Sequence, residues 1–228
     1  MPWTDYTLND FLLFAPETYQ RLFIRYHEAI WPLQIPVVIA MLVIPWLILR
    51  RGGVEPRMMR IALPILAVVW VWIGTDFLYQ RYGEINWAAV WPAAGFMLQG
   101  VLLLATAFAE PEQPPDVRVP PAARDAGLLV MAAAVILLPL AAPLSGRPWL
   151  SAELVGVTPD ATALFTLGLL ALKPLRLRLL LLPVPLLWCL LSTLTQIAMD
   201  WPDAWILPAL AAAAVAATLL PREKGIGR

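Results

Sequence analysis

The sequence predicts an all-α protein, a polytopic transmembrane bundle of about seven spans preceded by an amphipathic interfacial helix. Three observations predict it. Of 228 residues, 61% are hydrophobic and only 14% are charged, whereas a soluble domain is roughly 45–50% apolar and about 25% charged. The mean hydropathy is +0.73. The apolar residues also gather in runs of about 20, the length that crosses a hydrocarbon core of roughly 30 Å.

Residues 1–30 precede the first of these runs and have an amphipathic pattern. Apolar side chains recur at helical spacing from Leu8 to Ile30, interrupted at Pro16, with charged residues between them. A basic stretch followed by a short apolar one is missing, so a cleavable signal peptide is not expected. We expect an interfacial helix on the outer face of the membrane. A helix that packs over the mouth of the bundle as a lid fits the same pattern.

The apolar runs fall into two groups, three in residues 31–108 and four in residues 127–220. The expected spans are 31–49, 58–78, 87–108, 127–144, 158–172, 177–198 and 205–220. Residues 109–126 between the groups are Pro-rich and acidic, which is typical of an extended linker on the inner side. Residues 221–228 form a short basic tail. The short connections elsewhere predict antiparallel neighbours in one bundle.

The distribution of charge predicts the orientation, because short cytoplasmic loops retain Lys and Arg during insertion. With the N-terminus outside and the C-terminus inside, twelve of the sixteen basic residues fall on inner segments. Tryptophans fall near the outer ends of the spans, where indole rings prefer the headgroup region. These are Trp31, Trp72, Trp87, Trp91, Trp149, Trp201 and Trp205. The expected location is the plasma (inner) membrane.

The composition excludes several classes of protein. Sixteen basic residues balance sixteen acidic ones, which removes the positive field of a nucleic-acid-binding protein. A single Cys and a single His leave no disulfide framework and no zinc site on two or three histidines within one chain. The motifs GxGxxG, GxxxxGK[ST], GxSxG and HExxH are absent. We expect no nucleic acid, metal or cofactor, and an enzyme is the less favoured class.

Polar side chains within the spans are the candidates for a binding site, because an ionisable group costs roughly 2.5–3.5 kcal/mol at the centre of a span. The ligand-binding candidates are Asp76, Gln99, Thr158, Asp160, Gln196 and Asp200. Secondary candidates are Gln34, His27, Glu84, Asn86 and Ser192. Ser192, Gln196 and Asp200 follow one helix face at four-residue spacing. For His27, which has no second histidine beside it, a structural role is favoured over a metal site or proton relay.

The span at residues 158–172 is short, about 22 Å of helix against a hydrocarbon core of roughly 30 Å. It opens on Thr158-Pro159-Asp160, a helix start with Thr as N-cap and Pro at the first helical position. We expect residues 150–160 to dip inward. With Asp76, Gln99, Gln196 and Asp200 they would line an outward-open polar cavity. The alternative is that these acids are solvated or paired locally, Asp76 with Arg81.

Three stretches of the sequence carry a family resemblance. They are YTLNDFLLF at residues 6–14, EINW at 84–87, and VGVTPDATA at 155–163, which leads into Thr166-Leu167-Gly168. Together they resemble a family of small bacterial multi-pass integral-membrane proteins of unknown function. The resemblance implies a multi-pass membrane location and no established activity, so it transfers no catalytic or binding residue.

Three functions remain open at the level of sequence. The first is a transporter or channel-like protein for a small solute or cation, binding in an outward-facing acidic cavity; prolines in the spans supply the helix breaks that gating folds use. An alternative is a non-catalytic membrane sensor or assembly partner. The second alternative, an intramembrane enzyme acting on lipid, needs Asp76, Asp160 and Asp200 within hydrogen-bond reach. The expected partner is the lipid bilayer, with a homo-oligomer or protein partner left open.

Overall fold

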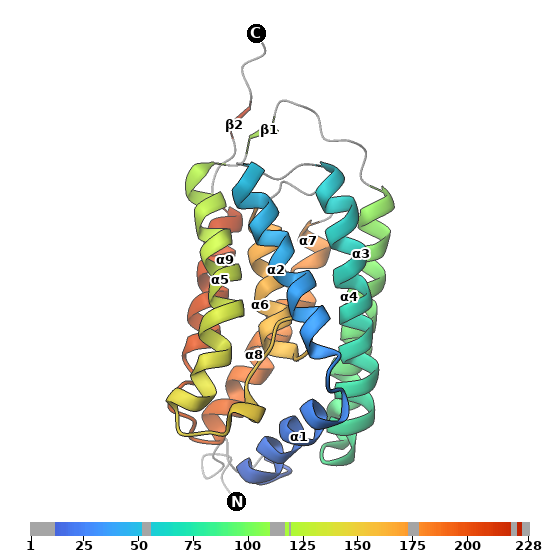
Figure 1. Ribbon diagram of the computed structural model, residues 1–228, viewed down its shortest axis with the longest axis vertical. Helices are drawn as coiled ribbons and strands as arrows, with labels where there is room; N and C mark the ends of the chain where they lie inside the picture. The colour runs from blue at the N-terminus through green and yellow to red at the C-terminus, as the bar shows by residue number, and fades with distance from the viewer. Residues whose placement is uncertain are drawn as a thin grey trace, which may run out of the picture.

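The computed structural model of the protein describes residues 12–51, 56–109, 117–118, 120–172, 178–219 and 223–224. Within them the regular secondary structure is helical apart from one two-residue antiparallel pair, β1 (Val117–Arg118) with β2 (Glu223–Lys224). Most helices run along the long axis of the bundle, and α1 lies across one end of it (Figure 1). The predicted all-α class is therefore confirmed. Residues 1–11 of the predicted amphipathic segment, residues 110–116 and 119 of the predicted linker, and residues 221, 222 and 225–228 of the predicted tail lie outside the described residues.

Helix α1 (Pro16–Ala29) begins at a proline, which is favourable at the first helical position because its missing N–H would have no partner there. Its apolar face turns into the protein, where Phe23 and Tyr26 each contact Phe77 with ring centroids 5.0 Å apart. The opposite face is exposed and charged, with Glu17, Arg21, Arg25 and Glu28. This is the arrangement of a lid over the end of the bundle.

Each of the seven predicted apolar runs is mostly helical over its described residues. They correspond to α2 (Gln34–Arg51), α3 (Pro56–Trp72) with the π-helical η3 (Ile73–Arg81), α4 (Val90–Ala109), α5 (Pro121–Leu144), α6 (Pro159–Leu172), α7 (Arg178–Leu181) with α8 (Pro183–Ala198), and α9 (Ile206–Leu219). Three short 3₁₀ turns, η4 (Tyr82–Glu84), η5 (Trp87–Ala89) and η6 (Trp149–Ser151), lie in the connections at the α1 end.

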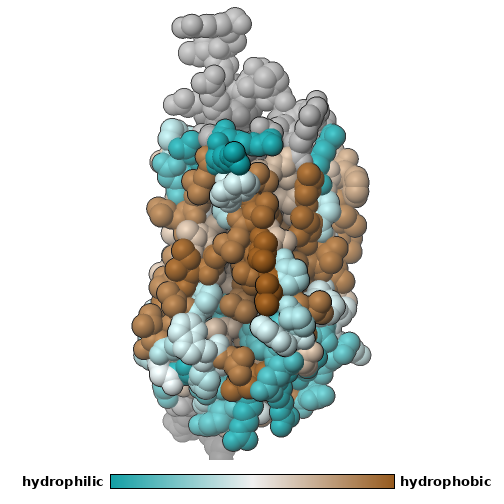
Figure 2. All heavy atoms as spheres, in the orientation of Figure 1, coloured by the Kyte–Doolittle hydropathy of each residue, from teal (hydrophilic) through white to brown (hydrophobic). Residues whose placement is uncertain are grey.

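Five helical segments are long and apolar enough to cross a membrane, as expected of a membrane protein. These are Gln34–Arg51, Met58–Glu84, Trp87–Ala109, Pro121–Leu144 and Leu179–Ala198. Helices α6 and α9 are apolar but shorter. Figure 2 shows hydrophobic side chains over the middle of the molecule and hydrophilic ones towards its two ends. An apolar belt of this kind is the surface that a hydrocarbon solvent requires.

The largest difference from the predicted span boundaries is at the start of α5. Helix α5 begins at Pro121, six residues before the expected start at Gly127, so residues 121–126 belong to a helix and not to the linker. The reason is local. Proline at the first position has the helical φ angle already, and the alanines and arginine that follow it are strong helix formers. A search for uncharged runs misses such a charged first turn.

Helix α6 forms the centre of the bundle, and every one of its fourteen residues is buried. It packs against α5, α8 and α9. Its closest approach is to α5, where Gly127 and Gly168 face each other. A Cβ atom built on either glycine would lie 2.8 Å from the carbonyl oxygen of the other. The two backbones are therefore in direct contact, which is how small residues allow apolar helices to associate in a membrane.

Replacing Gly168 by Ala should lower the free energy of unfolding by about 1–3 kcal/mol, because the new methyl group would force the α5 and α6 backbones apart. The matched control is Gly95→Ala on α4, where the added Cβ meets only Val184 at 3.7 Å. That variant should be as stable as the parent or up to about 1 kcal/mol more stable. Thermal unfolding of both in one detergent measures the difference, and equal stabilities would contradict the contact.

Candidate functional site

The segment between η6 and α6 runs from the α1 end into the interior of the bundle (Figure 1). Val155, Val157 and Thr158 are at most 2% exposed. Gly156 has a φ of +79°, and a Cβ at this position would lie 2.7 Å from Val37 of α2. Only glycine fits both the left-handed backbone and the space. This segment includes most of residues 150–160, for which the sequence predicted an inward dip.

Threonine hydroxyls satisfy the backbone of this buried turn. The Thr158 hydroxyl accepts a hydrogen bond from the Leu154 N–H at 2.8 Å and lies 3.1 Å from the Leu154 carbonyl oxygen. The Thr162 hydroxyl accepts from the Gly156 N–H at 2.9 Å. A helix can begin inside an apolar protein only where such partners replace water.

Helix α1 fixes the same segment from the other side. The Tyr26 hydroxyl donates to the Val157 carbonyl at 3.0 Å and accepts from Trp72 Nε1 at 3.0 Å. His27 Nε2 lies 3.0 Å from the Ala152 carbonyl oxygen. Burial lowers the pKa of His27, against the raising effect of this hydrogen bond. His27 is thus an anchor of the loop, which is the structural role that the sequence favoured for it.

Asp160, in the first turn of α6, is 2% exposed and receives three side-chain hydrogen bonds from α8. Trp188 Nε1 donates to Oδ1 at 2.7 Å, while Ser192 Oγ and Gln196 Nε2 donate to Oδ2 at 2.7 and 2.8 Å. The three donors are spaced four residues apart and therefore share one helix face. Three donors suit an ionised carboxylate, which can only accept, and the N-terminus of α6 favours the same negative charge.

Three further charged side chains lie next to Asp160. The Arg147 guanidinium forms an ion pair with Asp203 and stacks on the ring of Trp201, 3.8 Å from its centroid. Arg147 and Asp203 are each 10% exposed at the side chain. Glu153 Oε2 and Asp203 Oδ1 are buried and have no hydrogen-bond partner among the described residues. We call Arg147, Glu153, Asp160 and Asp203 the carboxylate centre.

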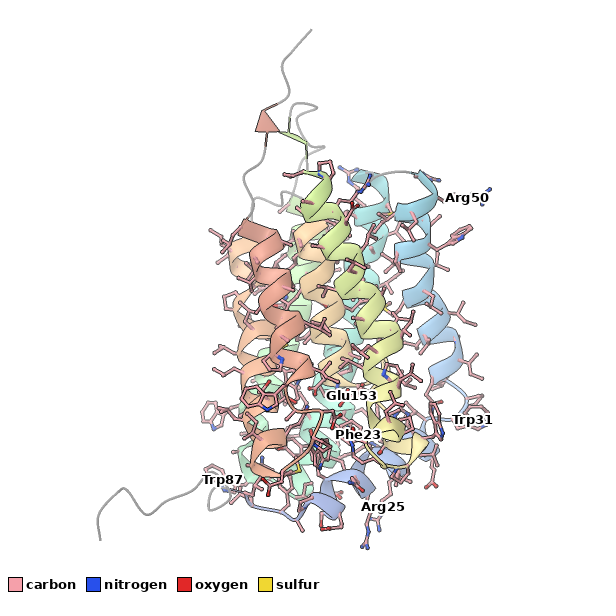
Figure 3. All side chains as sticks on the ribbon, turned by 90° about the vertical axis from the view of Figure 1, so that its left-hand side faces the viewer. Phe23, Arg25, Trp31, Arg50, Trp87 and Glu153 are labelled. Carbon is pink, nitrogen blue, oxygen red and sulfur yellow. The ribbon has the colours of Figure 1, made fainter. Side chains whose placement is uncertain are left out.

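The carboxylate centre surrounds a cavity of about 20 Å³, which Ser151, Gln196 and Trp201 also line. A cavity of this size has room for roughly one water molecule. Figure 3 shows Glu153 near the α1 end, on the bundle side of Phe23 of α1. The site is therefore a small pocket near the α1 end, with polar and apolar walls (Figure 3). The sequence predicted an outward-open polar cavity lined by residues 150–160 together with Asp76, Gln99, Gln196 and Asp200. Of these residues, Ser151, Glu153, Asp160 and Gln196 line the cavity described here.

Charge in the carboxylate centre is unbalanced, because one guanidinium faces three carboxyl groups. Burial raises the pKa of the Glu153 carboxyl well above its ordinary value, and the neighbouring charge of Asp160 raises it further. Hydrogen bonds with Thr158 and the Ala161 backbone oppose that rise. Burial lowers the pKa of Arg147, and the Asp203 carboxylate opposes this. Glu153 therefore keeps its proton to a higher pH than an exposed glutamate does.

Two acidic candidates lie outside the carboxylate centre. Asp76 on η3 accepts from Arg81, with Oδ2 3.2 Å from Nε, which is the local pairing considered as the alternative. Asp200 is exposed and has a φ of +54° in the turn after α8. There its N–H bonds the Ile197 carbonyl at 3.0 Å and the next N–H bonds the Gln196 carbonyl at 3.1 Å, a Schellman motif. Neither acid lines the cavity of Asp160.

Gln99 is fully buried on α4 and donates from Nε2 to the Leu181 carbonyl at 3.0 Å. In a continuous helix that carbonyl would accept from the N–H four residues later, but residue 185 is a proline. Gln99 thus supplies the donor that Pro185 lacks. This contact holds the break between α7 and α8.

The remaining candidates have local partners or lie at the surface. Gln34 Nε2 donates to the His27 carbonyl at 2.6 Å, so it fixes the end of α1. Asn86 Oδ1 accepts from the Ala88 N–H at 3.0 Å and caps η5. Glu84 is exposed.

The structure thus brings Thr158, Asp160, Ser192 and Gln196 together from the predicted set. Sequence reasoning missed the other members of the carboxylate centre and the donor Trp188. For Glu153 a signal existed, since it is an acid between Ala152 and Leu154 within the segment expected to dip inward.

The protein is a helical bundle whose long apolar helices are those of a membrane protein. Its carboxylate centre lies at the end of the bundle that α1 covers (Figure 1). Residues 16–225 match a family of unknown function, DUF6064, and the chain belongs to that family. The match extends from the first residue of α1 past the last residue of α9. No curated protein and no solved structure matches the chain.

Removing the guanidinium by Arg147→Ala should cost about 3–5 kcal/mol of unfolding free energy, because Asp203 would lose its ion pair and Glu153 and Asp160 would lose a neighbouring positive charge. The control is Arg81→Ala, since Arg81 pairs with Asp76 at 30% and 20% side-chain exposure and lies over the Tyr26 ring at 5.2 Å. Such a partly exposed ion pair, together with the contact to the ring, contributes about 1–2 kcal/mol to the unfolding free energy. Denaturant titration in detergent compares them, and a loss at Arg147 no larger than at Arg81 would refute a buried charge centre.

Proposed function

We propose that the chain is a multi-pass protein of the plasma membrane, with α1 outside and the C-terminus inside. The distribution of charge supports this orientation. Arg50, Arg51, Arg60 and Arg124 lie in the helical turns at the end opposite α1. Figure 3 shows Arg50 at that end, and Trp31 and Trp87 towards the α1 end. Basic residues inside and indole rings at the outer interface are the pattern of inserted helices. Helices α6 and α9 complete seven spans within the bundle.

A membrane-impermeant maleimide should label Glu17→Cys in intact cells and should leave Asp125→Cys unlabelled until the cells are opened. Glu17 lies on the exposed face of α1, and Asp125 has 59% side-chain exposure near the start of α5. The native Cys189 is buried and gives a low background. Labelling of Asp125→Cys from outside would reverse the orientation.

Within this bundle we propose a transporter or channel-like function for a proton or another small monovalent cation, bound at the carboxylate centre. The observation that carries the proposal is the excess of carboxyl groups, three against one guanidinium, around a cavity of about 20 Å³. An uncompensated buried charge is costly. A proton or cation at this site removes that cost, so the centre has a built-in affinity for one.

The dimensions of the site favour a proton over larger ligands. A cavity of about 20 Å³ is far below the roughly 300–1,000 Å³ of small-molecule sites. Among the described residues, no group of three or more His, Cys, Asp or Glu side chains could hold a metal ion. Glu153, with its unpartnered Oε2, is the group that we assign to proton uptake. Asp160, held by three donors, is the fixed negative charge beside it.

Exchange with water on the outer side requires movement of α1 or of the segment after η6. Tyr19 and Phe23 of α1 are buried, and Tyr19 lies against Trp201 with ring centroids 5.8 Å apart. Because Trp201 carries the Arg147 guanidinium on its ring, opening at α1 would reach the carboxylate centre directly. The lid and the centre are therefore neighbouring parts of one pathway.

Proton flux into proteoliposomes, followed with an internal pH-sensitive dye under a potassium diffusion potential, tests this function. We expect Glu153→Gln and Asp160→Asn to abolish flux, because the first cannot release a proton and the second removes the fixed charge. Asp76→Asn and Asp200→Asn are the matched controls at the same end of the bundle and should transport normally. Infrared spectra should show a protonated carboxyl band that titrates with pH and is missing in Glu153→Gln alone.

An absence of flux in the unmodified protein, or equal flux in all four variants, would contradict transport. The infrared band separates the two parts of the proposal. If the band is present and flux is absent, the centre binds a proton in a sensor; if both are absent, the carboxylate centre has no part in proton binding.

A further inference from the structure

An apolar groove of about 390 Å³ separates α4 from α8 on the outside of the bundle. Its walls are apolar side chains, among them Trp91 and Phe96 of α4 and Leu187 and Leu191 of α8. Gly95 of α4 also lines the groove and has no side chain to fill it. Leu187 is 65% exposed. The groove therefore opens on the surface of the apolar belt. Its volume lies in the range of small-molecule sites, roughly 300–1,000 Å³.

A second cavity of about 300 Å³ adjoins this groove and shares Pro92, Leu191 and Leu194 with it. This cavity has polar groups, the hydroxyl of Tyr82 and the side chains of Asn86 and Thr195. Asn86 Nδ2 donates to the Tyr82 hydroxyl at 3.0 Å. This second cavity lies at the α1 end of the bundle, at the start of α4, where Trp87 and Trp91 are 76% and 74% exposed. Exposed indole rings of this kind mark the headgroup level of a membrane.

The two cavities together have the polarity of an amphiphile, with an apolar trough that leads to a polar mouth at the interface. We infer that they form a binding site for one membrane lipid from the leaflet at the α1 end. One acyl chain lies between α4 and α8, and the ester and headgroup region lies at Tyr82, Asn86 and Thr195. The inference rests on the membrane location proposed above and is independent of proton transport.

A lipid fits this site better than a second copy of the chain does. The Tyr82 hydroxyl in the polar mouth accepts from Asn86 Nδ2 and has a proton of its own to donate. Apolar side chains of a partner helix would offer no acceptor for this proton. A lipid supplies apolar atoms to the trough and ester or phosphate oxygens to the mouth. Burial of a chain in the trough contributes through packing, because the surrounding hydrocarbon is equally apolar.

The groove also touches the carboxylate centre through one residue. The ring of Trp188 lines the groove, and its Nε1 donates to Asp160 at 2.7 Å. Phe96 packs edge-on against the same ring, with centroids 5.2 Å apart. A lipid in the groove therefore packs against the side chain that holds the Asp160 carboxylate.

Photo-crosslinking of the full-length protein in detergent, with a phospholipid that carries a diazirine on its acyl chain, tests the site. Crosslinks mapped by mass spectrometry should concentrate in residues 91–96 and 187–194, and excess unlabelled phospholipid should remove them. Gly95→Leu should lower the yield about tenfold, equivalent to roughly 1.4 kcal/mol of binding free energy. The space beside Gly95 accepts a Cβ at an ordinary 3.7 Å from Val184.

The control variant is Ala132→Leu, the same kind of enlargement at an exposed position of α5, which should not change the yield. Leu187→Trp fills the groove from α8 and repeats the test should Gly95→Leu unfold, as judged by its melting temperature. Crosslinks spread evenly over all apolar helices, or a yield unchanged in both groove variants, would overturn the inference. So would protein-to-protein crosslinks at α4 and α8 that persist in excess phospholipid, which would make the groove an interface between copies.

Discussion

The Asp160 carboxylate is bound by three donors from one face of α8, and the rest of the structure is arranged around this contact. It joins the start of α6 to the last three turns of α8 in the interior of the bundle, where Asp160 is 2% exposed. A buried carboxylate with fewer donors would cost several kcal/mol. Helix α6 can therefore occupy the centre of the bundle only in the register that presents Asp160 to Trp188, Ser192 and Gln196. Its opposite side is fixed by the backbone contact between Gly168 and Gly127 of α5.

The same constraint explains the shape of the α1 end. A helix that starts inside the bundle needs partners for the backbone that leads to it. Thr158 and Thr162 supply them from within the segment, and Tyr26 and His27 supply them from α1. Helix α1 is thus part of the support of the carboxylate centre as well as its cover. This dual position is why movement of the lid would change both access to the centre and its hydrogen bonding.

Two sites that differ in chemistry meet at Trp188. Its indole N–H donates to Asp160 of the carboxylate centre, and its ring lines the groove between α4 and α8. An indole suits this position because it combines one hydrogen-bond donor with a large apolar surface. Gln99 has a comparable role on α4, where it completes the hydrogen bonding of Leu181 before α8 begins. Gln99 thus joins α4 to α7 by a hydrogen bond, while the groove between α4 and α8 stays open at the surface of the bundle.

The sequence by itself determined the helical class, the positions of the seven apolar runs, the helix start at Thr158-Pro159 and the shared face of Ser192 and Gln196. These follow from composition and from periodicity along one chain. Only the tertiary structure placed Glu153 beside Asp160, paired Arg147 with Asp203 at a separation of 56 residues, and separated Gln99, Asp76 and Asp200 from the centre. The physical reason is that helices apolar on all sides carry no pattern that distinguishes a buried face from a lipid-facing one. Which faces meet depends on small residues and buried polar contacts, and these become visible only when the helices are packed.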